Sequence, residues 1–158
     1  MPITATDIKK LREETGAGVM ECKAVLTEAQ GNYKQALVLI KQRGLLKAEK
    51  KSDRETKEGV VVAYVHANNK VASLVELQCE TDFVARNDEF LTLAKNIAMQ
   101  VAAMNPADVK ELLAQEYIRD ESHTVEQLVK QLSGKIGENM TVARFERMEL
   151  GESQESAQ

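Results

Sequence analysis

Residues 79–90 hold the densest group of side chains that could do chemistry: Cys-Glu-Thr-Asp-Phe-Val-Ala-Arg-Asn-Asp-Glu-Phe. They follow a strand-like run and precede a predicted amphipathic helix, so the middle of the stretch is expected to be a loop. Phe83, one of three phenylalanines in the chain, has two open interpretations. It can pack under the start of the helix while Asp82, Asn87 and Asp88 cap free N–H groups, or it can project as a binding probe. Residue type alone favours packing, because exposed aromatic side chains on loops are uncommon.

Patterns typical of enzymes are missing from the sequence. It contains no Gly-Lys-Ser/Thr phosphate loop, no nucleophile elbow, no Cys and His spacing suited to a metal and no convincing pair of catalytic carboxylates. The two histidines, His66 and His123, are interpreted as surface residues without a catalytic or metal-binding role. We therefore expect a protein that is not an enzyme, has no catalytic residue, binds no metal and needs no cofactor.

Composition and charge restrict the class of partner. With 43% hydrophobic and 29% charged residues and no apolar run of membrane length, the chain is expected to be a soluble globular protein that does not bind membranes. The absence of a secretory signal and the isolated cysteines, Cys22 and Cys79, predict reduced thiols and a cytoplasmic location. Residues 1–50 have a net charge of +3 and residues 59–158 a net charge of −7. An acidic body argues against nucleic acid as a partner, because phosphate binding needs a concentrated basic face.

The elements that must position these side chains begin with three short helices within residues 1–45. Thr4 is a predicted N-cap, Gly16-Ala17-Gly18 forms a corner, Asn32 caps the third helix and Gly44 ends it. The apolar positions recur at helical spacing between these signals. This pattern predicts a three-helix bundle of the ubiquitin-associated type.

The rest of the chain is predicted to be a charged linker, an α+β core and a frayed tail. These parts cover residues 46–58, 59–150 and 151–158. The core has the order β-β-α-α-α-β, with strands at 59–66, 71–79 and 141–150 and helices at 88–104, 106–117 and 124–136. Three strands with helices on one face form a thin layer around a three-stranded antiparallel sheet.

Alternation assigns the side chains of the second and last strands of this core to the two faces of the sheet. In the second strand Val75 and Leu77 share the core face with Cys79. In the last strand the same alternation places Val142 on one face and Phe145 on the other. The second face of so small a sheet is mixed in character, and proteins rarely leave such a face in water, so we expect a partner to cover it.

The run Thr-Asp-Phe-Val-Ala-Arg-Asn at residues 81–87 resembles the signature loop of the elongation factor Ts family, whose members are nucleotide-exchange factors for the GTPase elongation factor Tu. In that family the Asp and Phe of the loop reach beside the nucleotide site of the GTPase, disturb the Mg²⁺ and phosphate environment and promote release of GDP. The resemblance assigns this partner binding to Thr81, Asp82, Phe83 and Val84, and support of the loop to Ala85, Arg86 and Asn87.

A second run, residues 11–23, is similar to the family's other signature, where the corner and the following helix dock on the GTPase domain. The resemblance assigns partner contacts in the bundle to Leu11, Arg12, Gly16, Gly18, Val19, Met20 and Lys23. Val19 departs from the pattern, because many relatives have a second Met there, and the apolar contact is expected to be smaller. Packing in the bundle core remains an equal interpretation for Leu11 and an alternative for Met20.

The resemblance extends over residues 3–150 and includes the run Gly-Lys-Ile-Gly-Glu-Asn at 134–139. Longer relatives have a second core subdomain, for which this chain has no room. We therefore expect a short form with a single core subdomain that assembles as a homodimer through its sheet. A general adaptor that binds proteins through the N-terminal bundle is the competing interpretation.

Overall fold

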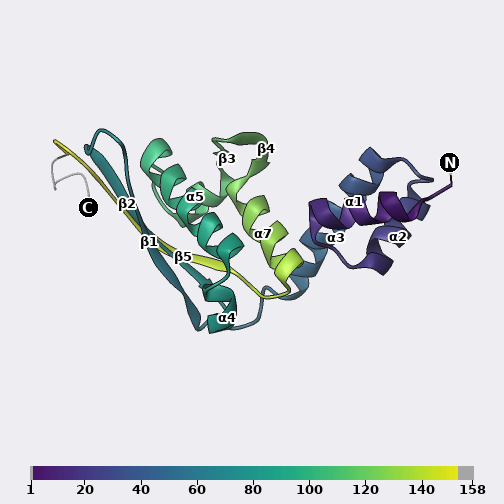
Figure 1. Cartoon of the computed structure of the whole chain (residues 1–158). Coiled ribbons are helices and arrows are strands. Elements are labelled where there is room, and N and C mark those ends of the chain that lie inside the picture. Colours follow the sequence, from purple (N-terminus) through teal and green to yellow (C-terminus); the bar gives the residue numbers. More distant parts are fainter. Residues whose placement is uncertain (1, 153–158) are drawn as a thin grey trace.

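The computed structural model describes residues 2–152 as a helical bundle joined to a sheet covered by helices (Figure 1). The helices are α1 (Ala5–Thr15), α2 (Val19–Glu28), α3 (Tyr33–Lys50), α4 (Asp82–Ala85), α5 (Asp88–Met104), α6 (Val109–Ala114) and α7 (Val125–Ile136). The strands are β1 (Glu58–Val65), β2 (Val71–Cys79), β3 (Glu116–Tyr117), β4 (Asp120–Thr124) and β5 (Thr141–Glu149). The predicted α+β class and the three-stranded antiparallel sheet are confirmed. The predicted frayed tail lies mostly outside the described residues.

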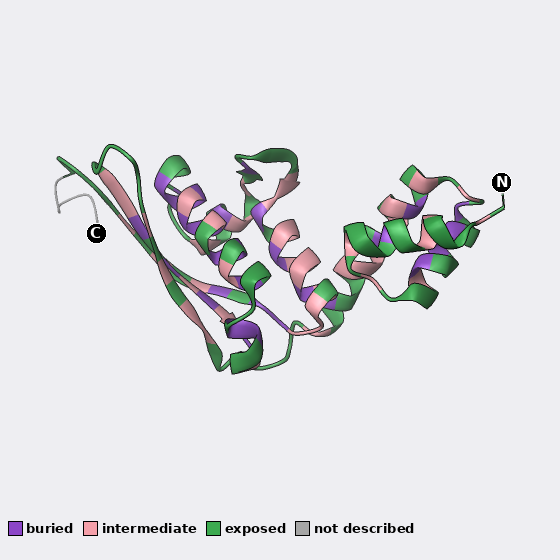
Figure 2. Cartoon of the chain, viewed as in Figure 1, coloured by how far each residue is buried: buried purple, intermediate pink, exposed green. Residues whose placement is uncertain are grey.

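Helices α1 to α3 form the predicted bundle at one end of the molecule. The Thr4 side chain accepts a hydrogen bond from the Asp7 amide, and the Asp7 carboxylate accepts one from the Thr4 amide, which makes a full capping box. Gly16 ends α1 in the left-handed conformation, and the Asn32 side chain caps α3. The bundle has its own core, which Figure 2 shows apart from the larger group of buried residues around the sheet.

Helix α3 is longer than the sequence pattern predicts. Gly44 was expected to end it, but the helix continues to Lys50 and takes in the first part of the predicted linker. Glycine inside a helix costs roughly 0.5–1 kcal/mol relative to alanine, and packing can offset that cost. A Cβ at Gly134 of α7 would lie 2.2 Å from the Gly44 carbonyl oxygen, so α3 and α7 cross there in close backbone contact. The bundle is thereby packed onto the core.

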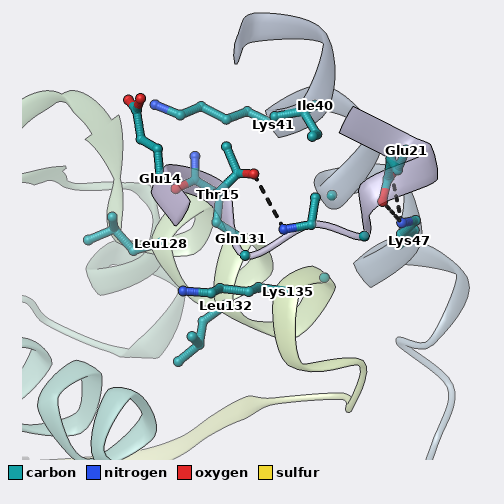
Figure 3. A pocket seen from close by; sticks show the side chains of 15 residues that line it. Glu14, Thr15, Glu21, Ile40, Lys41, Lys47, Leu128, Gln131, Leu132 and Lys135 are labelled. Atoms are coloured by element: carbon teal, nitrogen blue, oxygen red, sulfur yellow. Dashed lines mark hydrogen bonds and ion pairs between the residues drawn. The ribbon is translucent and has the colours of Figure 1, made fainter. Parts of the chain in front are cut away.

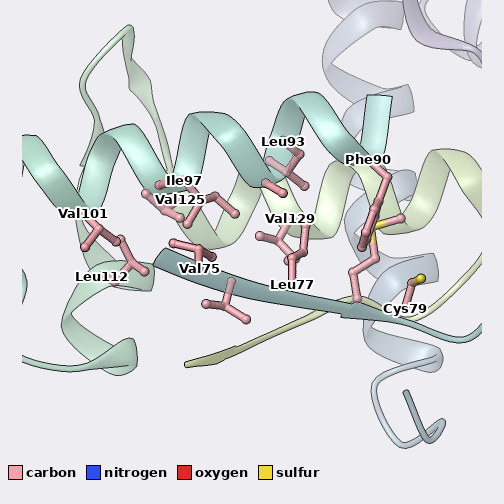
Figure 4. Packing of buried hydrophobic residues seen from close by; sticks show 14 of the residues in the cluster. Val75, Leu77, Cys79, Phe90, Leu93, Ile97, Val101, Leu112, Val125 and Val129 are labelled. Atoms are coloured by element: carbon pink, nitrogen blue, oxygen red, sulfur yellow. The ribbon is translucent and has the colours of Figure 1, made fainter. Parts of the chain in front are cut away.

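The core of the second part lies between the sheet and helices α5 and α7 (Figure 4). The strand order is β1-β2-β5, with both neighbouring pairs antiparallel. Val75, Leu77 and Cys79 of β2 point into the core, as predicted, against Phe90 and Ile97 of α5. In the part of the chain that the structure describes, helices cover this face of the sheet alone, and the alternating strand side chains that point toward them are the ones buried in the core.

The prediction for the last strand was wrong in its side-chain alternation. Val142 and Phe145 both pack on the core side, although their spacing should place them on opposite faces. The register with β2 jumps between Glu76 and Leu77, whose partners are Arg144 and Val142, so one residue is left over. Such a β-bulge shifts the alternation by one position.

A second small sheet was also not predicted. The helix expected to run to residue 117 ends at Ala114, and β3 and β4 form a hairpin instead. The buried side chain of Gln100 holds this hairpin against α5. Its amide nitrogen donates to the Glu116 carbonyl oxygen at 3.0 Å, and its oxygen accepts from the Ile118 amide at 3.0 Å. These hydrogen bonds satisfy backbone groups on the side of the hairpin that faces α5.

Candidate functional site

The predicted loop around Phe83 is a single helical turn, α4, with one side buried and the other side free. Thr81 is its N-cap, and its hydroxyl accepts a hydrogen bond from the Val84 amide at 3.4 Å. Val84 and Ala85 are buried in the core, whereas the Phe83 side chain is 78% exposed. The packing interpretation of Phe83 is therefore wrong. Val84, expected to contact a partner, instead anchors the turn.

Polar and charged groups brace the exposed side of α4. The Arg86 guanidinium donates to the Asp82 carboxylate at 2.6 Å and lies 5.7 Å from the centre of the Phe83 ring. The Arg86 guanidinium thus contacts both the Asp82 carboxylate and the Phe83 ring. An exposed ion pair of this kind contributes little to the stability of the fold. Asn87 caps the next helix by accepting hydrogen bonds from the Glu89 and Phe90 amides.

Sequence reasoning did not place Glu138 beside this turn, because its partners Glu80 and Thr81 lie 58 and 57 residues away. The Glu138 carboxylate accepts hydrogen bonds from the amides of Glu80 and Thr81 and from the Thr81 hydroxyl. Beneath it, the Cys79 thiol donates to the Thr81 carbonyl oxygen at 3.2 Å. Burial raises the pKa of the Cys79 thiol to about 11, and the nearby Glu138 carboxylate adds to the effect. This cysteine therefore stays protonated and packs as a core residue at neutral pH.

The second group of predicted contact residues lies at the corner between α1 and α2. Met20 is 75% exposed and Val19 is also exposed, so both side chains are available to a partner. Leu11 is fully buried in the bundle core, and its assignment to a partner contact is corrected accordingly. The remaining predicted contacts are Arg12 and Lys23, which are exposed, and Gly16 and Gly18, which form the corner.

A cavity of about 360 Å³ lies between this corner, α3 and α7 (Figure 3). Its walls come from the corner, α3 and α7, and include Gly16, Lys41, Lys47, Leu128 and Lys135. Lys47 pairs with Glu21 at 2.7 Å, and Lys135 pairs with Glu89 at 2.9 Å. The lining combines paired charged side chains with leucines and is not specific for one class of ligand. We therefore interpret the cavity as a gap in the packing between the bundle and the core.

The histidine at the β4 hairpin has neighbours that the sequence interpretation overlooked. His123 Nδ1 lies 2.9 Å from the Ser122 hydroxyl and 3.0 Å from the Asp120 carboxylate. A nucleophilic triad needs the acid and the nucleophile on different ring nitrogens, and here both meet Nδ1.

Within residues 2–152, no three His, Cys, Asp or Glu side chains gather closely enough to hold a metal ion. In the same part of the chain, no helix has the length and apolar character needed to span a bilayer.

Comparison with known proteins assigns the family. A sequence model described as Elongation factor TS matches residues 80–157. Elongation factor Ts of Fervidobacterium nodosum is 40% identical over 197 residues, and the alignment covers 96% of this chain and 100% of that protein. The chain belongs to the elongation factor Ts family. Elongation factor Ts of Pseudothermotoga lettingae is 44% identical with the same coverage, and that of Thermotoga maritima is 40% identical over 98% of this chain and 100% of the relative.

Membership of the elongation factor Ts family applies to both parts of the molecule, because the alignments take in nearly the whole chain. The alignments are longer than the 158 residues of the chain, so the relatives contain residues without a counterpart here. The family's members are translation elongation factors. Within the two groups of predicted contact residues, Phe83 and Met20 are the most exposed large apolar side chains.

Proposed function

We propose that this protein is a guanine nucleotide exchange factor that binds elongation factor Tu in its GDP form and promotes release of GDP. The observation that carries the proposal is the exposure of Phe83 on a turn whose other side is buried in the core. Exposing a large aromatic side chain has a free-energy cost in water, and it is typical of a surface that meets a partner. The site of action would be the cytoplasm, where translation takes place.

The mechanism follows from thermodynamic linkage. A protein that binds the nucleotide-free GTPase more tightly than the nucleotide-bound form lowers the affinity for nucleotide by the same factor. Phe83 would enter the partner beside its Mg²⁺ and phosphate site, and Asp82 would meet groups displaced there. Arg86 keeps the Asp82 carboxylate in place before binding, at 2.6 Å. The chain supplies binding energy and shape, and no bond is made or broken by its own side chains.

The bundle would provide the second contact. Met20 and Val19 would pack on the GTPase domain, with Arg12 and Lys23 close by to meet acidic groups. Once the bundle is bound, α4 is held near the same partner molecule, so its effective concentration at the nucleotide site is raised. Binding through the bundle would thus keep α4 at the nucleotide site during exchange.

The proposal is tested by release of a fluorescent GDP analogue from elongation factor Tu. Catalytic amounts of the protein should accelerate release, because an exchange factor dissociates and acts again. Binding without acceleration would contradict the proposal and favour a general adaptor that binds through the bundle.

We further propose that two copies assemble through the sheet face that no helix within residues 2–152 covers. This face exposes the side chains of Val61, Val65, Leu74 and Met148, and a group of exposed apolar side chains of this kind is typical of an interaction surface. In a symmetric dimer, each copy would bury this face against the same face of the other copy.

Light scattering at micromolar concentration should give the mass of a dimer, and Met148→Glu should give a monomer. A monomeric mass for the unmodified protein would contradict this assembly.

A further inference from the structure

The start of α4 is held by one carboxylate from a distant part of the chain. Glu138 Oε1 accepts hydrogen bonds from the Glu80 amide at 3.1 Å and the Thr81 amide at 3.0 Å, and Oε2 accepts from the Thr81 hydroxyl at 2.7 Å. Hydrogen bonds to an ionised acceptor are roughly twice as strong as neutral ones. All three act on the N-cap of α4 or on the residue before it.

The contact is reciprocal. The Asn139 amide donates to the Glu80 carboxylate at 2.8 Å, so each segment presents a carboxylate to the backbone of the other. The Asn139 side chain also donates to the carbonyl oxygens of Ser52 and Arg54, in the connection that follows α3. The segment after α7 is therefore bonded both to α4 and to the chain that leads from the bundle.

Glu138 itself is fixed to a rigid element. The Ser133 hydroxyl, on the last turn of α7, donates to the Glu138 carbonyl oxygen at 2.6 Å. Gly137 ends α7 with φ of 92°, a conformation that favours glycine and turns the chain toward α4. Two residues before it, the side chain of Lys135 lies against Gly16 at the corner of the bundle. The end of α7 thus contacts both groups of predicted partner-binding residues.

We propose that Glu138 is a positioning residue for nucleotide release, which sets the direction in which Phe83 projects. The inference rests on the proposed exchange function. A helix of one turn has no stability of its own, so external contacts must orient α4. Val84 and Ala85 fix its depth in the core, and Glu138 fixes its N-terminal end. The Glu138 carboxylate is already occupied by three donors, and it therefore acts through α4 and not by touching the partner.

The first test separates binding from release. With Glu138→Ala, the maximal rate of GDP release should fall about tenfold, on the order expected for lost hydrogen bonds to a charged group, while the half-saturating concentration stays within about twofold because the bundle contact is intact. Glu138→Gln should recover part of the rate, since its oxygen can still accept from the two amides. Glu121→Gln, the same change at an exposed site on β4, should match the unmodified protein.

Two further readouts show whether Glu138 acts through the turn. Adding Glu138→Ala to a Phe83→Ala variant should cause no further loss of rate, because both changes remove the same contact. Hydrogen exchange of the amides at residues 80–86 should quicken in Glu138→Ala while the amides of β2 and β5 keep their protection.

Several outcomes would overturn the inference. They are an unchanged release rate, unchanged protection of residues 80–86, a raised half-saturating concentration with an unchanged maximal rate, or losses that multiply in the double variant. If the unmodified protein does not accelerate GDP release at all, the exchange function fails, and with it the role in release. The hydrogen-exchange experiment then still shows whether Glu138 holds the turn, so the two failures are distinguishable.

Discussion

At the scale of single residues, Leu11 and Met20 show that neighbours in one family signature have opposite environments. Leu11 is fully buried among α1, α2 and α3, and Met20 projects from the first turn of α2. Both are large apolar residues, and their types do not distinguish core from contact. Truncating Leu11 should therefore lower the stability of the fold, whereas truncating Met20 should weaken partner binding.

Leu11→Ala should lower the free energy of unfolding by about 2–5 kcal/mol, because it leaves a cavity in a small core. Met20→Ala should change it by less than about 0.5 kcal/mol, as expected for an exposed side chain, while weakening binding to elongation factor Tu. Urea denaturation followed by circular dichroism, together with a binding titration, measures both effects. Equal stability of the two variants would contradict the environments described here.

Phe83 is a residue whose direction could not be predicted from its type. The sequence places it in a short stretch between a strand and a helix, where aromatic residues are usually buried. Its exposure results from the burial of Val84 and Ala85, which turns the preceding side chain outward. That arrangement depends on Glu138, which is remote in sequence. Only the resemblance to the elongation factor Ts family indicated that Phe83 contacts a partner.

At the scale of elements, the starts of α1 and α3 were predictable because N-capping is local. The predicted N-caps at Thr4 and Asn32 and the predicted corner at Gly16 are confirmed. The bulge in β5 and the β3–β4 hairpin were not predicted, since both depend on contacts with other elements. The hairpin is fixed by the buried Gln100, whose partners lie 16 and 18 residues away.

The capping box of α1 should make the N-terminal end of the bundle sensitive to acid. Hydrogen bonds from the Thr4 hydroxyl and amide lower the pKa of Asp7 below its ordinary value of 3.8. A carboxyl whose pKa is lower in the folded state stabilises it above the unfolded pKa. This contribution is therefore complete at neutral pH and is lost as the pH falls below 3.8 through the folded pKa.

The titration of Asp7 can be followed by NMR from its carboxyl carbon and from the Thr4 amide. We expect a midpoint below 3.8, with fraying of α1 at lower pH. Thr4→Val removes the hydroxyl and should move the midpoint back toward the ordinary value. A midpoint at or above 3.8 in the unmodified protein would contradict the capping box.

At the scale of the whole molecule, the bundle and the core are packed together beside residues 46–58, which were predicted to be a charged linker. The helix α3 extends past Gly44 and crosses α7 at Gly134. No local pattern predicted this crossing, because the two glycines are far apart in the sequence and each resembles a helix breaker by itself. The crossing restricts the separation between Met20 and the turn that carries Phe83.

Two glycine substitutions test this packing with a matched pair. In Gly134→Ala the new methyl group would lie 2.2 Å from a backbone oxygen, so α3 and α7 must move apart. In Gly44→Ala nothing lies within 4 Å of the new group, and the helix should gain roughly 0.5–1 kcal/mol. X-ray scattering should show a larger radius of gyration for Gly134→Ala, and thermal unfolding should occur at a lower temperature. Identical behaviour of the two variants would exclude the close crossing.

The measurement that tests the account most directly is the rate of GDP release from elongation factor Tu with the unmodified protein and with Phe83→Ala. The ring is exposed, so its removal should leave the free energy of unfolding unchanged within about 0.5 kcal/mol. The rate of release should nevertheless fall at least about tenfold, as expected for the loss of an aromatic contact that dominates an interface. A Phe83→Ala protein that folds normally and releases GDP as fast as the unmodified protein would contradict the central claim.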